Sequence, residues 1–310
     1  MLKFYLIPGW REPAFETKES AIGKIKSKRR TFRRLLTPLT IVGMGIILSI
    51  IFLAVYSPWL TPFTVDNLTG VDLLFETPYD DPSTNHPFGT TKFGFDLLGR
   101  MIWGSRTAVT IATFPAIIST LGGLSVGTIS AYFGGKVDSI IMRICDFWFS
   151  FPVLILVLII APLMGSSLYS ILIIYGLFSI AESARWVRTL VHQVKQNVYV
   201  RAAITSGAEK FKVMFKHILP NTISPIIVRF FGTMHTGILI IVSISFIGLG
   251  DPSIPNWGTD ILYGRGNYGA FSSTFWPAFL WPGFFIGITA IGFMLIGDGL
   301  RDALEPRLHI

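Results

Sequence analysis

Residues 123–127 (GLSVG) have the letters of a nucleophile elbow, with Ser125 in the position of the nucleophile. Such an elbow needs a sharp turn between a strand and a helix. Here the five residues lie inside an uncharged apolar run, where an isolated strand would leave its backbone groups without partners in lipid. The spacing of Gly123 and Gly127 instead predicts close helix packing, and Gly283 and Gly287 receive the same interpretation.

The residues needed for nucleotide hydrolysis or metal chemistry are not found in the sequence. A P-loop continues from Gly-Lys into Ser or Thr, but Gly23-Lys24 and Gly135-Lys136 continue into Ile and Val. The five histidines lack the spacing of metal ligands. His235 lies alone in an apolar span. It either lines a translocation path or, as we favour, is a neutral imidazole hydrogen-bonded between helices.

The composition is that of a polytopic membrane protein. The 310 residues have a mean hydropathy of +0.59, and only 14% of them are charged, against about 25% in a soluble domain. Spanning a bilayer takes roughly 20 apolar residues per helix. We therefore predict an all-α integral membrane fold with six transmembrane helices. The expected spans are 35–56, 107–133, two short spans within 147–181 that meet at a turn near 162–167, 230–250 and 277–297.

The basic residues predict the orientation. With six spans both termini share one side, and the Lys and Arg residues on the opposite side are only Lys92, Arg100, Arg106 and Arg265. Because basic residues accumulate on the cytoplasmic side, both termini are expected in the cytoplasm of a multi-pass cell-membrane protein. The net charge of +8 then reflects membrane topology, and the basic residues beside the membrane would contact anionic lipid. Nucleic acid is not an expected partner.

The spans divide the chain into a basic cytoplasmic lead (1–34), a first helix (35–56), an external loop (57–106), a core domain that holds the other five spans (107–297) and a cytoplasmic tail (298–310). The core contains a short loop at 136–143, a cytoplasmic insert at 193–221 and a second external loop at 251–276. The first external loop is expected to present an acidic surface, whose members are Asp66, Asp72, Glu76, Asp80, Asp81 and Asp96.

The insert is the most informative part of the chain, because it is polar and part-helical between two apolar spans. Gly207 interrupts its helical pattern where a positive φ would allow a sharp turn. Pro220 follows where the helix is expected to stop. Its apolar residues recur at helical spacing; they are Phe211, Met214, Phe215, Ile218 and Leu219.

Two interpretations of the insert are open. It could be an amphipathic helix in the headgroup layer, with Lys210, Lys212 and Lys216 facing lipid phosphates. It could instead be a short helix that packs into a groove of a partner protein. We favour docking, because a lipid-bound helix requires neither Gly207 nor so long a hydrophilic excursion.

Several stretches resemble the permeases of dipeptide, oligopeptide and nickel importers of the ATP-binding-cassette (ABC) class, over roughly residues 86–307. Their shared order and spacing make the resemblance specific; they are 86–90, 134–152, 184–188, 199–203, 246–250 and 297–304. The insert is similar to the loop by which such permeases grip their ATPase. It departs from the general pattern at Arg201, where Glu is usual, and at His217, where Ile is usual.

The resemblance implies a C-type subunit with the type I permease bundle and a cytoplasmic coupling helix. It implies a second, different permease, two cytoplasmic P-loop ATPases that bind ATP and Mg²⁺, and an external solute-binding protein. This chain itself would bind no cofactor or metal and catalyse no reaction. The residues expected to couple to the ATPases are Arg201, Ala202, Ala203, Gly207, Ala208, Phe211, Met214, Phe215, Leu219 and Pro220. The residues expected to line the translocation path are Met234, His235 and Ser243.

Two other classes of protein stay open. A secondary transporter or a channel would work without an ATPase. A secondary transporter, however, needs paired carboxylates or broken helices at mid-membrane. No expected span holds a central Asp or Glu. A membrane-embedded enzyme would need a converging nucleophile and base. The cargo is not specified either: peptides, oligosaccharides and nickel chelates are all compatible with the resemblance.

Overall fold

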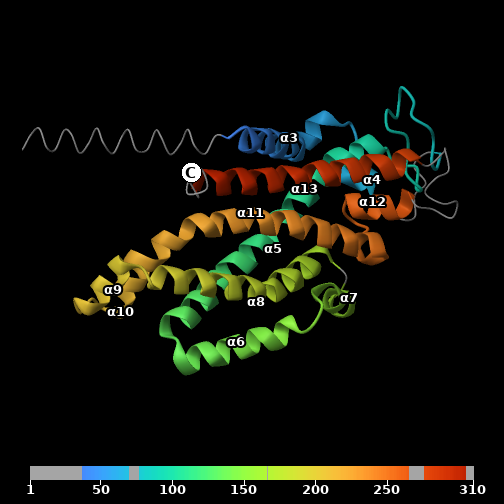
Figure 1. Cartoon of the computed structure of the whole chain (residues 1–310). Helices are drawn as coiled ribbons and strands as arrows, with labels where there is room; N and C mark the ends of the chain where they lie inside the picture. Colours follow the sequence, from blue (N-terminus) through green and yellow to red (C-terminus); the bar gives the residue numbers. More distant parts are fainter. Residues whose placement is uncertain (1–36, 70–76, 166, 265–275, 305–310) are drawn as a thin grey trace, which may run out of the picture.

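The computed structural model describes residues 37–69, 77–165, 167–264 and 276–304 (Figure 1). The long helices are α3 (Pro38–Leu60), α5 (Leu97–Phe133), α6 (Gly135–Phe149), α7 (Val153–Leu163), α8 (Leu168–Lys195), α11 (Leu219–Ile244) and α13 (Trp276–Leu304). The short ones are α4 (Val65–Leu68), α9 (Val198–Thr205), α10 (Lys210–Val213), α12 (Trp257–Gly264) and two π-helical stretches, η1 (Met214–Ile218) and η2 (Ser245–Leu249). The predicted lead 1–34, Asp72 and Glu76, and residues 265–275 and 305–310 of the predicted loop and tail lie outside the described residues.

The all-α membrane class is confirmed. Five helices of the described part are long and apolar enough to cross a membrane, and the pair α6–α7, bent by 78°, makes a sixth if it counts as one broken span. Most helices run beyond the predicted spans: α5 begins at Leu97 and α8 ends at Lys195. The apolar run measures only the hydrocarbon thickness, whereas a helix continues wherever its backbone bonds and caps are satisfied.

The short loop predicted at 136–143 is wrong, because those residues belong to α6. The turn from α5 into α6 takes place instead at Gly134 and Gly135, whose φ angles are +66° and +54°. Helix α6 then gives way to α7 at 150–152, where Pro152 provides no N–H for a continuous helix. The third span is therefore broken, and only its second half is wholly apolar.

The predicted helix stop at Pro220 is also wrong. One helix runs from Phe211 to Leu249, straight through Pro220. Proline lacks an N–H, and its ring clashes with the carbonyl group four residues earlier. The chain accommodates this by widening into η1 directly before the proline, where the Leu219 N–H bonds to the carbonyl of Met214, five residues back.

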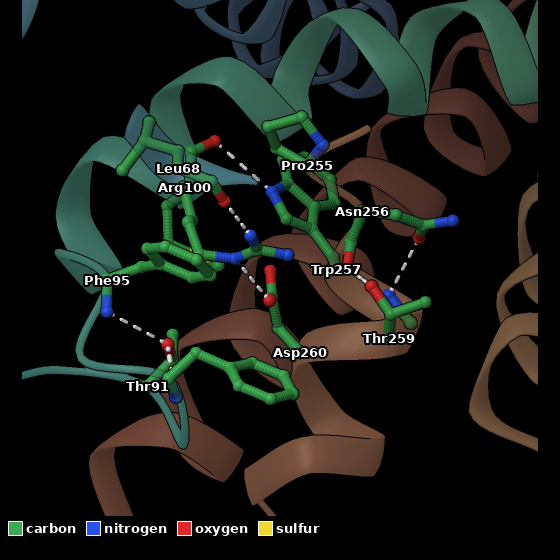
Figure 2. Close-up of polar contacts among 12 residues, drawn as sticks. Leu68, Thr91, Phe95, Arg100, Pro255, Asn256, Trp257, Thr259 and Asp260 are labelled. Carbon is green, nitrogen blue, oxygen red and sulfur yellow. Dashed lines mark hydrogen bonds and ion pairs between the residues drawn. The ribbon is translucent and has the colours of Figure 1, made fainter. Parts of the chain in front are cut away.

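Opposite ends of the bundle carry the insert and the loops. Helices α9 and α10 project at one end, which we call the insert end, and α4 and α12 pack at the other, the loop end (Figure 1). At the loop end Arg100 of α5 is buried; its Nε donates to Asp260 of α12 over 2.6 Å, and a second N–H donates to the Leu68 carbonyl (Figure 2). The Trp257 indole N–H donates to the Met101 carbonyl. Both loops are thereby held against the start of α5.

Asp96 does not belong to the predicted acidic surface. Its carboxylate is buried, where it accepts the Gly99 N–H at the N-terminus of α5 and lies 2.9 Å from Nδ1 of His86. A carboxylate at this position satisfies one of the otherwise unpaired N–H groups of the first turn. Asp66, Asp80 and Asp81 are exposed, as predicted.

Helices α5 and α8 approach closely at two glycines. A Cβ added to Gly123 would lie 2.3 Å from Cβ of Ser183, and one added to Gly127 would lie 2.4 Å from the Ala184 carbonyl oxygen. The predicted G-x-x-x-G packing is therefore confirmed here. For Gly283 and Gly287 the prediction is wrong within the described part of the chain, because open space adjoins both.

We expect Gly127→Leu to destabilise the purified protein, because the side chain meets backbone atoms of α8 that cannot move aside. Overpacking of this kind costs about 1–3 kcal/mol or more, so the midpoint of thermal unfolding in detergent should fall by several degrees. Gly283→Leu enters open space and is the matched control. Equal midpoints for the two variants would contradict the α5–α8 contact described here.

Candidate coupling site

The insert turns sharply at Gly207. Helix α9 ends there in a Schellman motif: the Gly207 N–H bonds to the Ile204 carbonyl, and the Ala208 N–H bonds to the Ala203 carbonyl. Gly207 has a φ of +78°, a conformation in which a side chain would be strained. The turn predicted at this residue is confirmed. It sets the direction in which α10 and η1 leave α9.

The inner face of the insert packs on the chain's own helices. Its buried residues are Val200, Val213, Met214 and Ile218. They form one cluster with Ala131 and Tyr132 at the end of α5, Val187 and Val191 of α8, and Ile226 of α11. Lys195 Nζ donates to the Tyr132 carbonyl over 2.9 Å and lies 5.3 Å from the centre of that ring. The insert is thus fixed to the ends of three long helices.

The outer face of the insert is apolar and uncovered by the chain. Phe211 and Phe215 are 58% and 61% exposed, and Ile204 of α9 is also exposed. So are Arg201 and Ala202 of the same helix. We call these five residues the insert face. The Phe211 ring lies edge-on to the ring of Phe133 in α5, with the centroids 6.5 Å apart. Large apolar groups held open on a rigid turn are typical of a surface that another protein covers.

The predicted coupling residues separate into three groups. Five of them are exposed on α9, the turn, α10 and η1: Arg201, Ala202, Gly207, Phe211 and Phe215. Met214 is only 6% exposed and supports the insert from beneath, as do the half-buried Ala203 and Ala208. Leu219 and Pro220 lie at the start of α11, half-buried and exposed respectively. Helical spacing identified the segment without distinguishing its two faces.

Three Arg–carboxylate pairs join the long helices near the insert end. Arg188 of α8 donates to both carboxylate oxygens of Asp138 in α6, over 2.6 and 2.5 Å. Arg185 pairs with Asp146 between the same two helices. Arg229 of α11 pairs with Glu182 of α8. The two α6 pairs were not predicted, because α6 was expected to be a loop. Bidentate pairing keeps helices in register.

The residues predicted for the path face different surroundings. His235 lies with Nδ1 2.8 Å from the Ala290 carbonyl of α13, so the predicted hydrogen bond between helices is present. Met234 is buried inside the chain. Ser243 is exposed on α11, and so are Thr236 and Gly232, about two and three turns nearer the insert. These three residues share one exposed face of the helix with Leu239.

A bundle of five or six spans with a helical insert at one end is the architecture of a type I ABC importer permease. Residues 123–310 match the family described as the binding-protein-dependent transport system inner membrane component, and the chain belongs to this family. It is therefore a multi-pass permease subunit of a transport system.

Curated relatives cover most of the chain. The glutathione transport system permease protein GsiD of Pectobacterium atrosepticum is 33% identical over 90% of this chain and 91% of its own length. The dipeptide transport system permease protein DppC of Alkalihalophilus pseudofirmus is 33% identical over 96% and 95%. The oligopeptide transport system permease protein OppC of Bacillus subtilis is 35% identical over 87% and 86%. The resemblance expected from the sequence blocks is confirmed.

We expect Gly207→Val to loosen the insert while leaving the bundle intact. A β-branched residue at positive φ costs about 1–2 kcal/mol, which would raise hydrogen–deuterium exchange of the α9 and α10 amides about tenfold. Gly207→Asn is the control, because asparagine tolerates this conformation. The explanation fails if both variants exchange at the same rate as the wild type.

Proposed function

We propose that this chain is the C-type permease of an ATP-driven importer of peptides. It pairs with a second, different permease to form the translocation path. Two P-loop ATPases complete the importer, and one of them binds to the insert face of this chain. ATP and Mg²⁺ are bound by those partners and not by this chain. The names of the relatives support a peptide as cargo, since they describe dipeptide, oligopeptide and glutathione transport.

The observation that carries the proposal is the pair of exposed rings, Phe211 and Phe215, on an insert packed against the chain's own helices. An uncovered apolar surface needs a partner to shield it from water. The insert is also stiff, because Met214 and Ile218 anchor it from beneath. Movement of the ATPases would therefore be passed to α5, α8 and α11 together. The bundle would rock between a state open to one side of the membrane and a state open to the other.

The orientation follows from charge. The described insert end bears Arg201, Lys212 and Lys216, all exposed, and an accumulation of basic residues favours the cytoplasm. The loop end would then face outward with Asp66, Asp80 and Asp81, which are available to a solute-binding protein. The buried Arg100–Asp260 pair would keep that receiving surface rigid.

An uncoupled secondary transporter is less well supported. Two carboxylates that such a mechanism could use, Asp146 and Glu182, each bind an arginine, and Asp298 lies in the last two turns of α13, away from mid-membrane. A proton- or sodium-binding carboxylate must be free to change its charge or partner during transport. The lipid-bound insert is the stronger competitor, and a matched pair of variants separates it from docking.

We expect Phe211→Asp with Phe215→Asp to lose the ATPases. In a mild-detergent purification from native membranes, the wild type should recover a second permease and two P-loop proteins, identified by mass spectrometry. The double variant should retain the second permease and reduce ATPase recovery at least tenfold, because two buried aromatic contacts are worth more than about 1.4 kcal/mol.

The control is Lys212→Glu with Lys216→Glu, which reverses charge and leaves the rings in place. A lipid-bound insert would give the opposite results. The Lys212→Glu, Lys216→Glu variant would then release the insert from the surface of anionic vesicles, and the Phe211→Asp, Phe215→Asp variant would still recover the ATPases. Recovery of the wild-type chain without any ATPase would reject the proposed function as a whole.

A further inference from the structure

A cavity of about 290 Å³ lies near the insert end, between α8, α11 and α13. The charged and titratable residues that line it are Arg229, His235, Asp298 and Arg301. Val228 and Met294 provide apolar wall. The volume is close to the lower end of the roughly 300–1,000 Å³ found for small-molecule sites. The cavity thus combines both signs of charge with room for a small ligand.

The cavity extends from the hydrocarbon layer across its boundary. Counting 1.5 Å per residue from Leu249, where the helix through α11 and η2 ends, His235 lies about 21 Å along that helix; counting from Trp276, Arg301 lies about 37 Å along α13. The hydrocarbon layer is about 30 Å thick. His235 therefore lies within the layer, whereas Arg229 lies at its boundary and Asp298 and Arg301 lie beyond it. The lining of the cavity thus runs from inside the layer to the insert end.

Arg229 has one donor that the fold does not use. Its Nη2 donates to Glu182, and the guanidinium lies 5.7 Å from the centre of the Trp186 ring. Its Nε–H is buried and has no hydrogen-bond partner among the described residues. Buried polar groups are nearly always satisfied, so an unsatisfied arginine N–H beside a cavity marks a place where a carboxylate or another acceptor fits.

The mixture of charges selects the class of ligand. A small anion would be attracted by Arg229 but repelled by Asp298. A small cation would be repelled by Arg229 and Arg301. A molecule with a carboxylate at one end, an ammonium group at the other and a short apolar body between them satisfies all three features of the lining. Di- and tripeptides with free termini have that constitution.

We propose that this cavity is a transient binding site for zwitterionic short peptides on their way through the permease. Arg229 receives the peptide carboxylate, Asp298 receives its ammonium group, and a side chain lies against Val228 and Met294. The inference rests on the proposed function for its cargo class. Because a path must release what it binds, the affinity is weak, in the millimolar range.

The test uses the complex purified with this chain, in lipid nanodiscs, and the dipeptide alanyl-photoleucine, whose diazirine cross-links on illumination. After protease digestion, mass spectrometry should find the label on the fragments of this chain that contain Val228 or Met294. Unlabelled alanyl-leucine should compete. N-acetyl-alanyl-leucinamide, which has the same body without charged ends, should compete at least fivefold less well. This comparison uses the wild-type chain alone.

Variants then assign the charges. Arg229→Gln and Asp298→Asn should each reduce labelling at least fivefold. Arg185→Gln is the matched control, because it also breaks an arginine–carboxylate pair of α8, with Asp146, but does not line the cavity. The control should label as the wild type does.

Three results would overturn the inference: equal competition by the capped peptide, labelling indifferent to both cavity variants, or a phospholipid found by native mass spectrometry whose removal is needed before labelling occurs. The last would assign the cavity to a lipid headgroup. Each can occur while the ATPases still co-purify, in which case the importer proposal stands and only the cavity assignment fails. Loss of the ATPases from the wild type would instead reject the importer.

Discussion

The close contact of α5 with α8 is the constraint on which the rest of the structure depends. Lipid tails are as apolar as the helices, so membrane helices associate through close packing of their surfaces. Gly123 and Gly127 remove the side chains that would hold the two backbones apart. The same approach brings Tyr132 and Val191 together beneath the insert. The place of the insert at the end of the bundle thus depends on glycines in the apolar part of α5.

Helix α5 connects the two ends of the molecule. Its 37 residues extend about 55 Å, which exceeds the thickness of the hydrocarbon layer. At one end Arg100 and Met101 hold α12 and the end of α4 at Leu68. At the other end Ala131 and Tyr132 hold the insert. A load applied at either end reaches the other through one continuous helix. A displacement at one end can therefore reach the other without a chain of moving side chains.

The sequence predicted what depends on local chemistry. Apolar runs identified the spans and fold class, and the turn at Gly207 followed from one residue. Helix ends were less predictable, since Asp96 extends α5 by capping it and η1 carries a helix through Pro220. Tertiary partners were not predictable at all: Arg100 and Asp260 meet across 160 positions. Helical spacing likewise grouped Phe211 with Met214, because it cannot tell which neighbours cover a face.

The Arg100–Asp260 pair also sets an order on how the protein is made. Arg100 leaves the ribosome long before Asp260, which follows the fifth span of the chain. Until α12 is synthesised, Arg100 at the start of α5 lacks its carboxylate partner Asp260, and the Met101 carbonyl lacks its hydrogen bond from the Trp257 indole. The loop end cannot close while the first four spans alone are in the membrane.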